Sequence, residues 1–232
     1  MNTDVFNKTR PTSQVTFDTF NNFVFLEEYR VFNKMVKRIE LYHQVKDLVG
    51  DIIEFGVFKG AGMALFLKLK HLYEPNSLTK IIGFDYFNRD EIINSLDGLN
   101  KTMMATITDR VNVNELLIES VNNKLSFFDM DNYLLIPGEA VQSCTEFDKH
   151  NPGARIKLLY MDLDLGEPTY HILKMLWNKV VKDGIIVFDE YAYHKWDESN
   201  GVDKFLKEIE GQYEFFNTKV VGPSAYMKKL VI

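Results

Sequence analysis

The stretch LLYMDLD at residues 158–164 decides the fold of this chain, and GIIVFDE at residues 184–190 repeats its pattern. Each stretch is an apolar run that ends in acidic residues. Strands this apolar are typical of a parallel sheet that helices cover on both faces. An acid at the last residue of such a strand emerges at the carboxyl edge of the sheet, where α/β proteins bind ligands. The two stretches therefore predict an α/β fold with carboxylates at its binding edge.

The acids that end these two runs are Asp162 and Asp164 in the first and Asp189 and Glu190 in the second. Several carboxylates in one crevice cost free energy unless a cation or a shared proton offsets their charge. Ligands that offer only oxygen suit a hard divalent ion. We therefore expect a Mg²⁺ (or Mn²⁺) site at this edge. Asp164 taken alone, like Glu167, is more simply interpreted as the N-cap of the helix that follows.

The rest of the chain alternates strand and helix patterns. We expect five parallel strands, at residues 51–55, 80–85, 133–140, 156–162 and 184–190. Helical spacing occurs at residues 64–73, 101–107, 111–124, 173–181 and 201–210, whereas residues 86–100 are polar and predict an irregular surface excursion. Residues 213–221 and 224–232 flank Gly222-Pro223 and predict a closing antiparallel hairpin. The expected sheet therefore has seven strands.

The segment before the first strand is predicted to form a helical appendage. Residues 17–49 carry apolar side chains at helical spacings, as one or two amphipathic helices would. We expect this segment to fold onto the carboxyl edge as a lid or to form a subunit contact. Five aromatic residues in it are expected to dock it on the core, with covering of the active site as the alternative: Phe17, Phe20, Phe23, Phe25 and Tyr29.

Composition favours one Rossmann-like domain at residues 50–232 behind a helical appendage at residues 1–49. The chain has 232 residues, of which 46% are hydrophobic, and no linker divides it. A net charge of −6 argues against a nucleic-acid partner. The single cysteine, Cys144, cannot form an internal disulfide and is expected to pack a helix. With no signal peptide or membrane span in the sequence, we expect a cytoplasmic protein, and a homo-oligomer remains open.

The turn after the first expected strand is rich in glycine. EFGVFKGAG places Gly56, Gly60 and Gly62 between strand and helix, where the backbone can approach a ligand closely. The spacing is not that of the dinucleotide fingerprint, and Glu54 stands where a pyrophosphate would lie. Asp85 ends the second strand, where an acid can accept hydrogen bonds from ribose hydroxyls. The expected ligand has an amine and a ribose but no pyrophosphate, as S-adenosylmethionine does.

These residues carry a family resemblance. EFGVFKG at residues 54–60, Asp85 and the closing hairpin resemble class I methyltransferases. MDLD at residues 161–164, FDEY at residues 188–191 and the helical preface resemble the macrocin O-methyltransferase (TylF/MycF-type) group, Mg²⁺-dependent enzymes that methylate sugar hydroxyls. The resemblance implies a seven-stranded, mostly parallel methyltransferase sheet.

Site residues also follow from this resemblance. It implies that Asp162, Asp189 and Glu190 bind the metal and that Asp162 is also the catalytic base. It implies a sugar-type small-molecule acceptor. The cofactor-binding residues that it implies are Glu54, Gly56, Phe58, Gly60, Gly62, Asp85, Gly138, Glu139 and Ala140.

The chain departs from the group at three positions, and two other functions stay open. The group has MDGD, then an aromatic residue, and a DDY triplet, where this chain has Leu163, Gly166 and Glu190. One alternative is a glycosyltransferase with Asp162-x-Asp164 as its metal clamp, and the other is a non-catalytic cofactor-fold module. His194 could act as a base or donor, but a solvated loop histidine is the more frequent case.

Overall fold

A seven-stranded sheet forms the centre of the protein in the computed structural model, which describes residues 13–232. The first twelve residues of the expected appendage lie outside the described residues. The strand order is β3-β2-β1-β4-β5-β7-β6. The strands are β1 (Asp51–Phe55), β2 (Ile81–Asp85), β3 (Tyr133–Pro137), β4 (Ile156–Met161), β5 (Val180–Phe188), β6 (Tyr213–Asn217) and β7 (Ala225–Lys229).

The direction of the strands confirms the expected mostly parallel sheet. Strands β3, β2, β1, β4 and β5 pair in parallel. Strand β7 pairs antiparallel with β5 on one side and with β6 on the other, so β7 is the reversed strand and β6 runs in the direction of β5. The closing hairpin therefore inserts its second strand next to the parallel core, as in the class I methyltransferase arrangement expected from the sequence.

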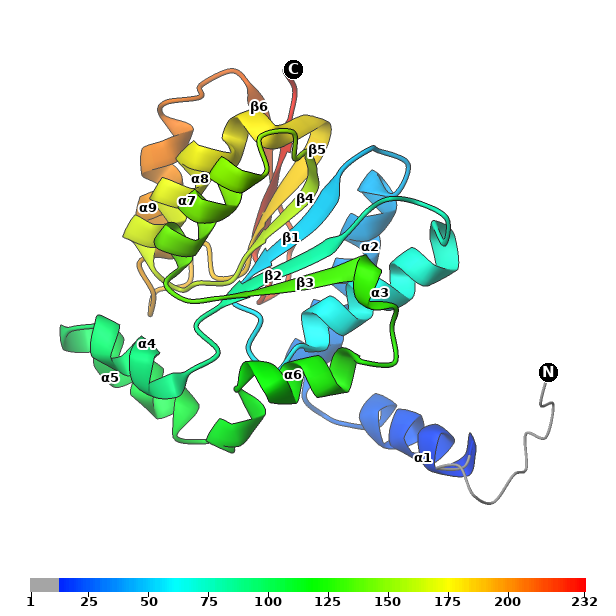
Figure 1. Cartoon of the computed structure of the whole chain (residues 1–232). Helices are drawn as coiled ribbons and strands as arrows, with labels where there is room; N and C mark the ends of the chain where they lie inside the picture. Colours follow the sequence, from blue (N-terminus) through cyan, green and yellow to red (C-terminus); the bar gives the residue numbers. More distant parts are fainter. Residues whose placement is uncertain (1–12) are drawn as a thin grey trace.

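Helices cover both faces of the sheet (Figure 1). Helices α7, α8 and α9 lie on one side, and α2, α3 and α6 lie on the other. Helices α4 and α5 project beyond the carboxyl end of β2, and α1 extends away from the sheet. The bounds are α1 (Ser13–Val24), α2 (Tyr29–Val45), α3 (Ala61–Tyr73), α4 (Arg89–Ser95), α5 (Gly98–Thr108), α6 (Ile118–Leu125), α7 (Ala140–His150), α8 (Gly166–Leu176) and α9 (Glu198–Leu206), with 3-10 turns η1 (Val113–Glu115), η2 (Met130–Asn132) and η3 (Trp177–Lys179).

The apolar runs that predicted the strands fill two cores, one on each face of the sheet. All six residues of β4 are buried. Leu159 and Met161 pack in the core beneath α7, α8 and α9, whereas Leu158 and Tyr160 pack in the core beneath α2 and α3. Because side chains alternate along a strand, a strand buried on both faces carries apolar side chains at successive positions, and the one charged residue of β4, Lys157, pairs with Glu74 at 2.7 Å.

Three local expectations were wrong, and one helix was not expected. Residues 86–100 are not an irregular excursion, because they contain α4 and the start of α5. The helix expected at residues 173–181 begins earlier and ends at Leu176, and Val180 already belongs to β5. The helix expected at residues 111–124 is instead η1 followed by α6. Helix α7, which was not predicted, follows β3. It buries Cys144 in the core, as expected for that residue.

The aromatic residues of the appendage do not dock it on the core. Phe17, Phe20, Phe25 and Tyr29 keep 60% or more of their surface exposed, and Phe23 packs against Phe32 of α2 instead. The appendage is anchored by the second half of α2, through buried side chains that are mainly apolar: Arg38, Leu41, Tyr42 and Val45.

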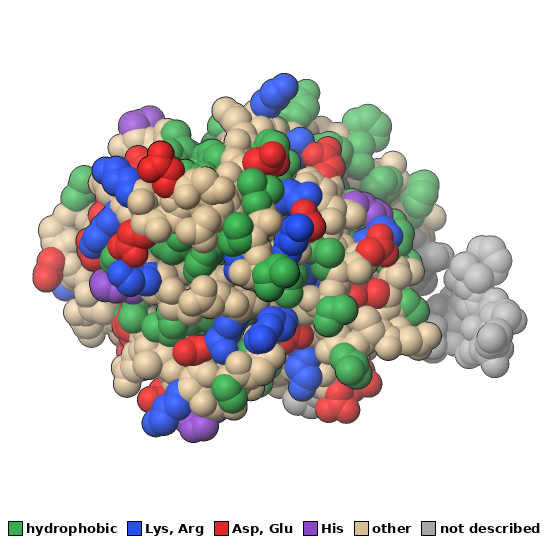
Figure 2. Space-filling model, turned by 90° about the horizontal axis from the view of Figure 1, so that it is seen from above, with side chains coloured by type: hydrophobic (Ala, Val, Ile, Leu, Met, Phe, Trp, Pro, Cys, Tyr) green, Lys and Arg blue, Asp and Glu red, His purple; other side chains and the backbone are tan. Residues whose placement is uncertain are grey.

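The surface shows no segregation of charge on the face seen in Figure 2, where acidic, basic and apolar side chains are intermixed. Among the described residues, no helix combines the length and the apolar character needed to cross a bilayer.

Candidate active site

The acids that end β4 and β5 lie next to each other, as the sequence predicted. Met161 pairs with Phe188 in the parallel register of these neighbouring strands. The backbone N–H of Asp189 donates to the carbonyl of Met161 at 3.0 Å, and the N–H of Asp162 donates to the carbonyl of Phe55 at 3.0 Å. The ends of β1, β4 and β5 are thus tied together at the carboxyl edge.

The glycine turn after β1 lies directly against this acidic edge. Gly56 has φ +87°, and a Cβ at this position would lie 2.0 Å from the carbonyl oxygen of Asp162. Only a residue without a side chain fits there in this conformation. Gly56 therefore brings the expected cofactor turn and the expected acceptor site into contact.

The other glycines of the turn allow close approach to different elements. Gly60 has φ +86° and precedes the first residue of α3, and a Cβ there would lie 2.9 Å from Cγ1 of Val121. At Gly62 a Cβ would lie 2.2 Å from Oε1 of Glu54. Between Gly56 and Gly60, Phe58 also adopts a positive φ of 53° and keeps 42% of its surface exposed.

Asp85 at the end of β2 holds the glycine turn in place. Its Oδ2 accepts the backbone N–H of Phe58 at 2.8 Å, and its Oδ1 accepts that of Phe87 at 3.0 Å. Burial raises the pKa of Asp85, while these backbone amides act in the opposite direction. The backbone amides of Val57 and Tyr86 act on the pKa of Asp85 in the same direction, so this carboxylate is surrounded by the backbone of the glycine turn and of the segment after β2.

The third expected cofactor segment adjoins Asp85. The N–H of Gly138 donates to the carbonyl of Asp85 at 3.0 Å, and Gly138 has φ +118°. Glu139 caps α7 by accepting the N–H groups of Val141 and Gln142 at 3.1 and 2.7 Å. Ala140 is buried. The segment from Gly138 to Ala140 therefore lies beside the β2 acid.

Helix α2 aims a row of basic side chains at the acids. Arg30, Lys34 and Arg38 are spaced four residues apart, so they lie on one face of the helix. Nη2 of Arg30 lies 2.7 Å from Oε1 of Glu190. Nζ of Lys34 lies 2.7 Å from Oδ2 of Asp162 and 2.9 Å from Oδ2 of Asp189.

The third member of this basic row pairs with the acid of β1. Nη2 of Arg38 lies 2.7 Å from Oε1 of Glu54, and both side chains are buried. The guanidinium also lies over the ring of Tyr160, 3.7 Å from its centroid. Oε2 of Glu54 is buried without a hydrogen-bond partner. This oxygen remains available to a cationic or N–H donor.

Burial and mutual repulsion raise the pKa values of three acids at this edge, Asp162, Glu190 and Asp164. Burial, followed by the charge of Asp189, raises the pKa of Asp162 to about 7, although Lys34 acts against this shift. Burial and the charge of Asp189 also raise the pKa of Glu190. The pKa of Asp164 is raised well above its ordinary value by burial and then by the charges of Asp162 and Glu190.

Asp164 does not cap the following helix, so that interpretation was wrong. Leu165 precedes α8 and makes no side-chain cap, and the N–H of Gly166 donates to Oδ1 of Asp197 at 3.0 Å. Asp164 has a left-handed φ of 64°. Glu167 lies within the first turn of α8 and pairs with Lys204 at 3.2 Å. His194 is exposed, in agreement with the more frequent case.

The arrangement of the acids does not fit the expected metal site. Lys34 forms ion pairs with Asp162 and Asp189, and Arg30 forms one with Glu190. Each expected metal ligand is therefore already paired with a side-chain cation. The other oxygen of Asp189, Oδ1, accepts the hydroxyl of Tyr160 at 2.5 Å. Within residues 13–232, no group of three or more His, Cys, Asp or Glu side chains is arranged to hold a metal ion.

Sequence reasoning missed the basic row and a further buried acid. Arg30, Lys34 and Arg38 could have been found, because their spacing puts them on one face of a helix that was expected. Glu198 at the start of α9 is fully buried, and burial followed by the charges of Asp189, Asp162 and Asp164 raises its pKa well above the ordinary value. No sequence pattern marks Glu198, because only the packing of α9 brings it near the strand ends.

Comparison with known proteins identifies the fold and the family. The model of the macrocin O-methyltransferase (TylF) family matches residues 28–216. CalS11, solved as a TDP-rhamnose 3'-O-methyltransferase of calicheamicin biosynthesis, is 25% identical with a TM-score of 0.67, over 97% of this chain and 89% of that one. No curated protein matches the chain.

Two more distant structures share the fold. The O-methyltransferase NovP is 18% identical with a TM-score of 0.65, over 86% of this chain and 80% of that one. An O-methyltransferase from Bacillus cereus, solved with SAH, is 11% identical with a TM-score of 0.50, over 94% of this chain and 89% of that one. Because the family match includes α2, the glycine turn and both acidic strand ends, this chain belongs to the macrocin O-methyltransferase (TylF) family and is a methyltransferase.

Proposed function

We propose that this enzyme transfers the methyl group of S-adenosylmethionine to a hydroxyl oxygen of a sugar or a glycosylated small molecule. The observation that carries the proposal is the contact between Gly56 and Asp162, which joins the cofactor turn to the acidic strand end. The family and the similarity to CalS11, a TDP-rhamnose methyltransferase, support a sugar-type acceptor.

The residues of the glycine turn suit this cofactor. Oε2 of Glu54 is buried without a partner, which fits an amine donor. Asp85 ends β2 against the glycine turn, and it is the proposed acceptor for the ribose hydroxyls. When bound, S-adenosylmethionine supplies a methyl carbon that its sulfonium group already activates. The protein then has to place the acceptor oxygen near that carbon and to remove a proton.

Asp162 is the proposed base. Its Oδ2 faces Lys34, and Oδ1 makes no bond to another described residue, so Oδ1 can accept the proton of an acceptor hydroxyl. A pKa of about 7 places this carboxyl near the working pH, where a general base combines the correct protonation state with adequate basicity. The predicted Mg²⁺ has no role in this mechanism, because Lys34 and Arg30 already lie on the three expected ligands.

We further propose that residues 1–49 form an appendage to the methyltransferase domain at residues 50–232. Helix α2 contributes Arg30 and Lys34 to the carboxyl edge, which supports a role of the appendage in covering the acceptor site. A sugar-type small molecule is the proposed partner.

Methyl transfer from labelled S-adenosylmethionine to TDP-rhamnose, other nucleotide-sugars, free sugars and simple phenols tests the acceptor class. Calorimetry tests the cofactor, and we expect S-adenosylhomocysteine to bind and NAD not to bind. Asp85→Asn should weaken S-adenosylhomocysteine binding, whereas Asp90→Asn, at a side chain that is 84% exposed, should not. A preference for NAD, or glycosyl transfer from a nucleotide-sugar, would instead support a different function.

A further inference from the structure

Lys34 lies where the sequence placed a divalent cation. Its Nζ lies 2.7 Å from Asp162 and 2.9 Å from Asp189, so a single ammonium bridges the acids of two neighbouring strands. The Lys34 side chain keeps 32% of its surface exposed, which leaves one side open to a ligand. Only 2% of the Asp189 side chain is exposed, and a buried carboxylate is costly unless a positive charge pairs with it.

Each of the three expected metal ligands already uses at least one carboxylate oxygen and Asp189 uses both, whereas Oδ1 of Asp162 and Oε2 of Glu190 have no hydrogen-bond partner among the described residues. Oδ1 of Asp189 accepts the Tyr160 hydroxyl, and Oδ2 accepts the Lys34 ammonium. Oδ2 of Asp162 accepts the same ammonium, and Oε1 of Glu190 accepts Arg30. Mg²⁺ requires near-octahedral oxygen ligands at about 2.1 Å, so a metal could enter only if Lys34 left.

Lys34 is held in this position by its helix. One turn before it, Arg30 pairs with Glu190, and one turn after it, Arg38 pairs with the buried Glu54. Leu41, Tyr42 and Val45 then anchor the end of α2 in the core. The ammonium is therefore carried on a fixed element and does not depend on a mobile surface chain.

Because an ammonium group has three N–H donors, Lys34 can serve an acceptor as well as the two carboxylates. Two donors are directed at Asp162 and Asp189, and the third is available for an acceptor oxygen. A positive charge at this distance stabilises the negative charge that develops on the oxygen during the transfer.

We propose that Lys34 is the resident cation of the acceptor site and that methyl transfer by this enzyme requires no divalent ion. This inference rests on the proposed function. The acceptor O–H bond breaks, its proton goes to Asp162, and the oxygen forms the new bond to the methyl carbon as the carbon–sulfur bond breaks. Lys34 donates a hydrogen bond to that oxygen throughout and is not itself consumed.

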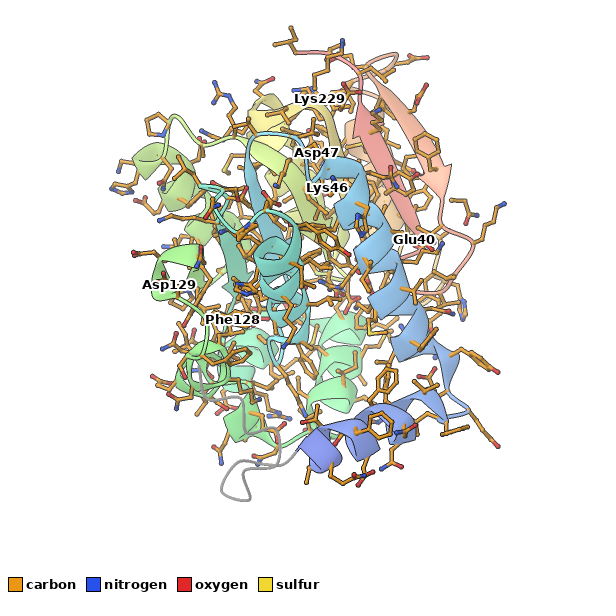
Figure 3. All side chains as sticks on the ribbon, turned by 90° about the vertical axis from the view of Figure 1, so that its right-hand side faces the viewer. Glu40, Lys46, Asp47, Phe128, Asp129 and Lys229 are labelled. Atoms are coloured by element: carbon orange, nitrogen blue, oxygen red, sulfur yellow. The ribbon has the colours of Figure 1, made fainter. Side chains whose placement is uncertain are left out.

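Metal binding tests the inference without reference to turnover. Mn²⁺ binding to the full chain is followed by electron paramagnetic resonance for the wild type, Lys34→Ala and Lys37→Ala. Lys37 is the matched control, because it lies on the same helix but pairs with Glu40, which keeps 53% of its side chain exposed and is labelled on α2 in Figure 3. We expect Mn²⁺ to bind Lys34→Ala, whose carboxylates are uncovered, but to bind neither the wild type nor Lys37→Ala.

Turnover of TDP-rhamnose provides the second measurement. We expect the wild type to keep its activity in excess chelator, and Lys34→Ala to lose roughly a hundredfold under the same conditions, with partial recovery in Mn²⁺. Circular dichroism and S-adenosylhomocysteine affinity, both unchanged, show that the variant is folded.

Three results would overturn the inference: stoichiometric Mn²⁺ binding to the wild type, wild-type turnover that a chelator abolishes and Mg²⁺ restores, or full activity of Lys34→Ala in chelator. The first two leave the proposed methyl transfer intact. Should TDP-rhamnose not be methylated under any condition, the acceptor proposal fails while the Mn²⁺ measurement still decides the role of Lys34.

Discussion

Arg38 of α2 and Glu54 of β1 form a buried ion pair, with Nη2 and Oε1 2.7 Å apart and no more than 5% of either side chain exposed. The pair joins the appendage to the strand that carries the expected cofactor acid. Burial alone would lower the pKa of Arg38, but Glu54 keeps the guanidinium charged, and Arg38 in turn opposes the upward shift that burial imposes on the pKa of Glu54.

Loss of one partner of this pair should be costly. We expect Arg38→Ala to lower the free energy of unfolding by about 3–5 kcal/mol, because it leaves a buried carboxylate without its cation. Urea denaturation measures the change. Arg38→Met combined with Glu54→Gln should recover part of the loss, whereas Lys37→Ala should have no measurable effect. A small effect of Arg38→Ala would contradict the view that Glu54 is held charged.

Activity should depend on pH through Asp162. Since the proposed base works deprotonated and its pKa is about 7, we expect kcat/KM to rise about tenfold per pH unit below pH 7 and to level off above it. The pH dependence of folding stability has the opposite sign, so stability falls over the range in which activity rises. A carboxyl whose pKa is raised from 3.8 on folding favours the folded state at low pH, and this contribution is lost as the pH rises from about 4 to about 7.

The variant Asp162→Asn separates these two effects. It should abolish the rise in kcat/KM with pH while removing the fall in stability over the same range. Rate profiles and unfolding midpoints at a series of pH values provide the measurement. A wild-type profile that is flat between pH 5 and pH 8 would rule out Asp162 as a base of this pKa.

Glu198 should destabilise the fold at neutral and alkaline pH. Its side chain is fully buried and neither carboxylate oxygen has a hydrogen-bond partner, so the charged form is disfavoured. Because folding raises the pKa of Glu198, the unfolded state loses its proton first as the pH rises above 4.5, and the folded state is progressively penalised. Thermal unfolding should show that Glu198→Gln is stabilising, with a gain larger at pH 8 than at pH 5. The opposite pH dependence would mean that Glu198 is charged and paired in the folded protein.

Gly56 should tolerate no side chain. Gly56→Ala combines a positive φ with a Cβ 2.0 Å from the carbonyl of Asp162, and we expect a loss of at least about 2 kcal/mol in denaturant unfolding. Gly153 is the control, because a Cβ there meets no atom within 4 Å. Gly60→Val would likewise overlap Val121 and strain the turn, so it should lower stability as well as cofactor binding.

Two truncations should distinguish the contribution of α1 from that of α2. No side chain between Gln14 and Val24 is buried, so deletion of residues 1–24 should leave stability and turnover close to those of the full chain. Deletion of residues 1–35 also removes Arg30 and Lys34 and should cost turnover far more than cofactor affinity. Equal turnover of the two truncated proteins would contradict a role for the basic row, and a change of mass in solution on the shorter deletion would identify α1 as a subunit contact.

The central sheet could be predicted from the amino-acid sequence, because the signals that mark it are local. A strand buried on both faces is an unbroken apolar run, and an acid at its end must emerge at the sheet edge, so LLYMDLD and GIIVFDE located β4, β5 and the acids that meet there. The turn after β1 could be predicted in the same way. Gly56 and Gly60 adopt positive φ angles, which glycine accepts more readily than any other residue.

The side chains that face those acids depend on how distant helices pack against the sheet. The sequence indicated that a cation was needed, but Lys34 is separated from Asp162 by 128 positions, and no local pattern shows which face of α2 meets which strand. The aromatic side chains of α1 suggested docking and are exposed, whereas Arg38 is buried because Glu54 pairs with it. Charge compensation between distant segments depends on how helices pack, and that packing is a property of the whole chain.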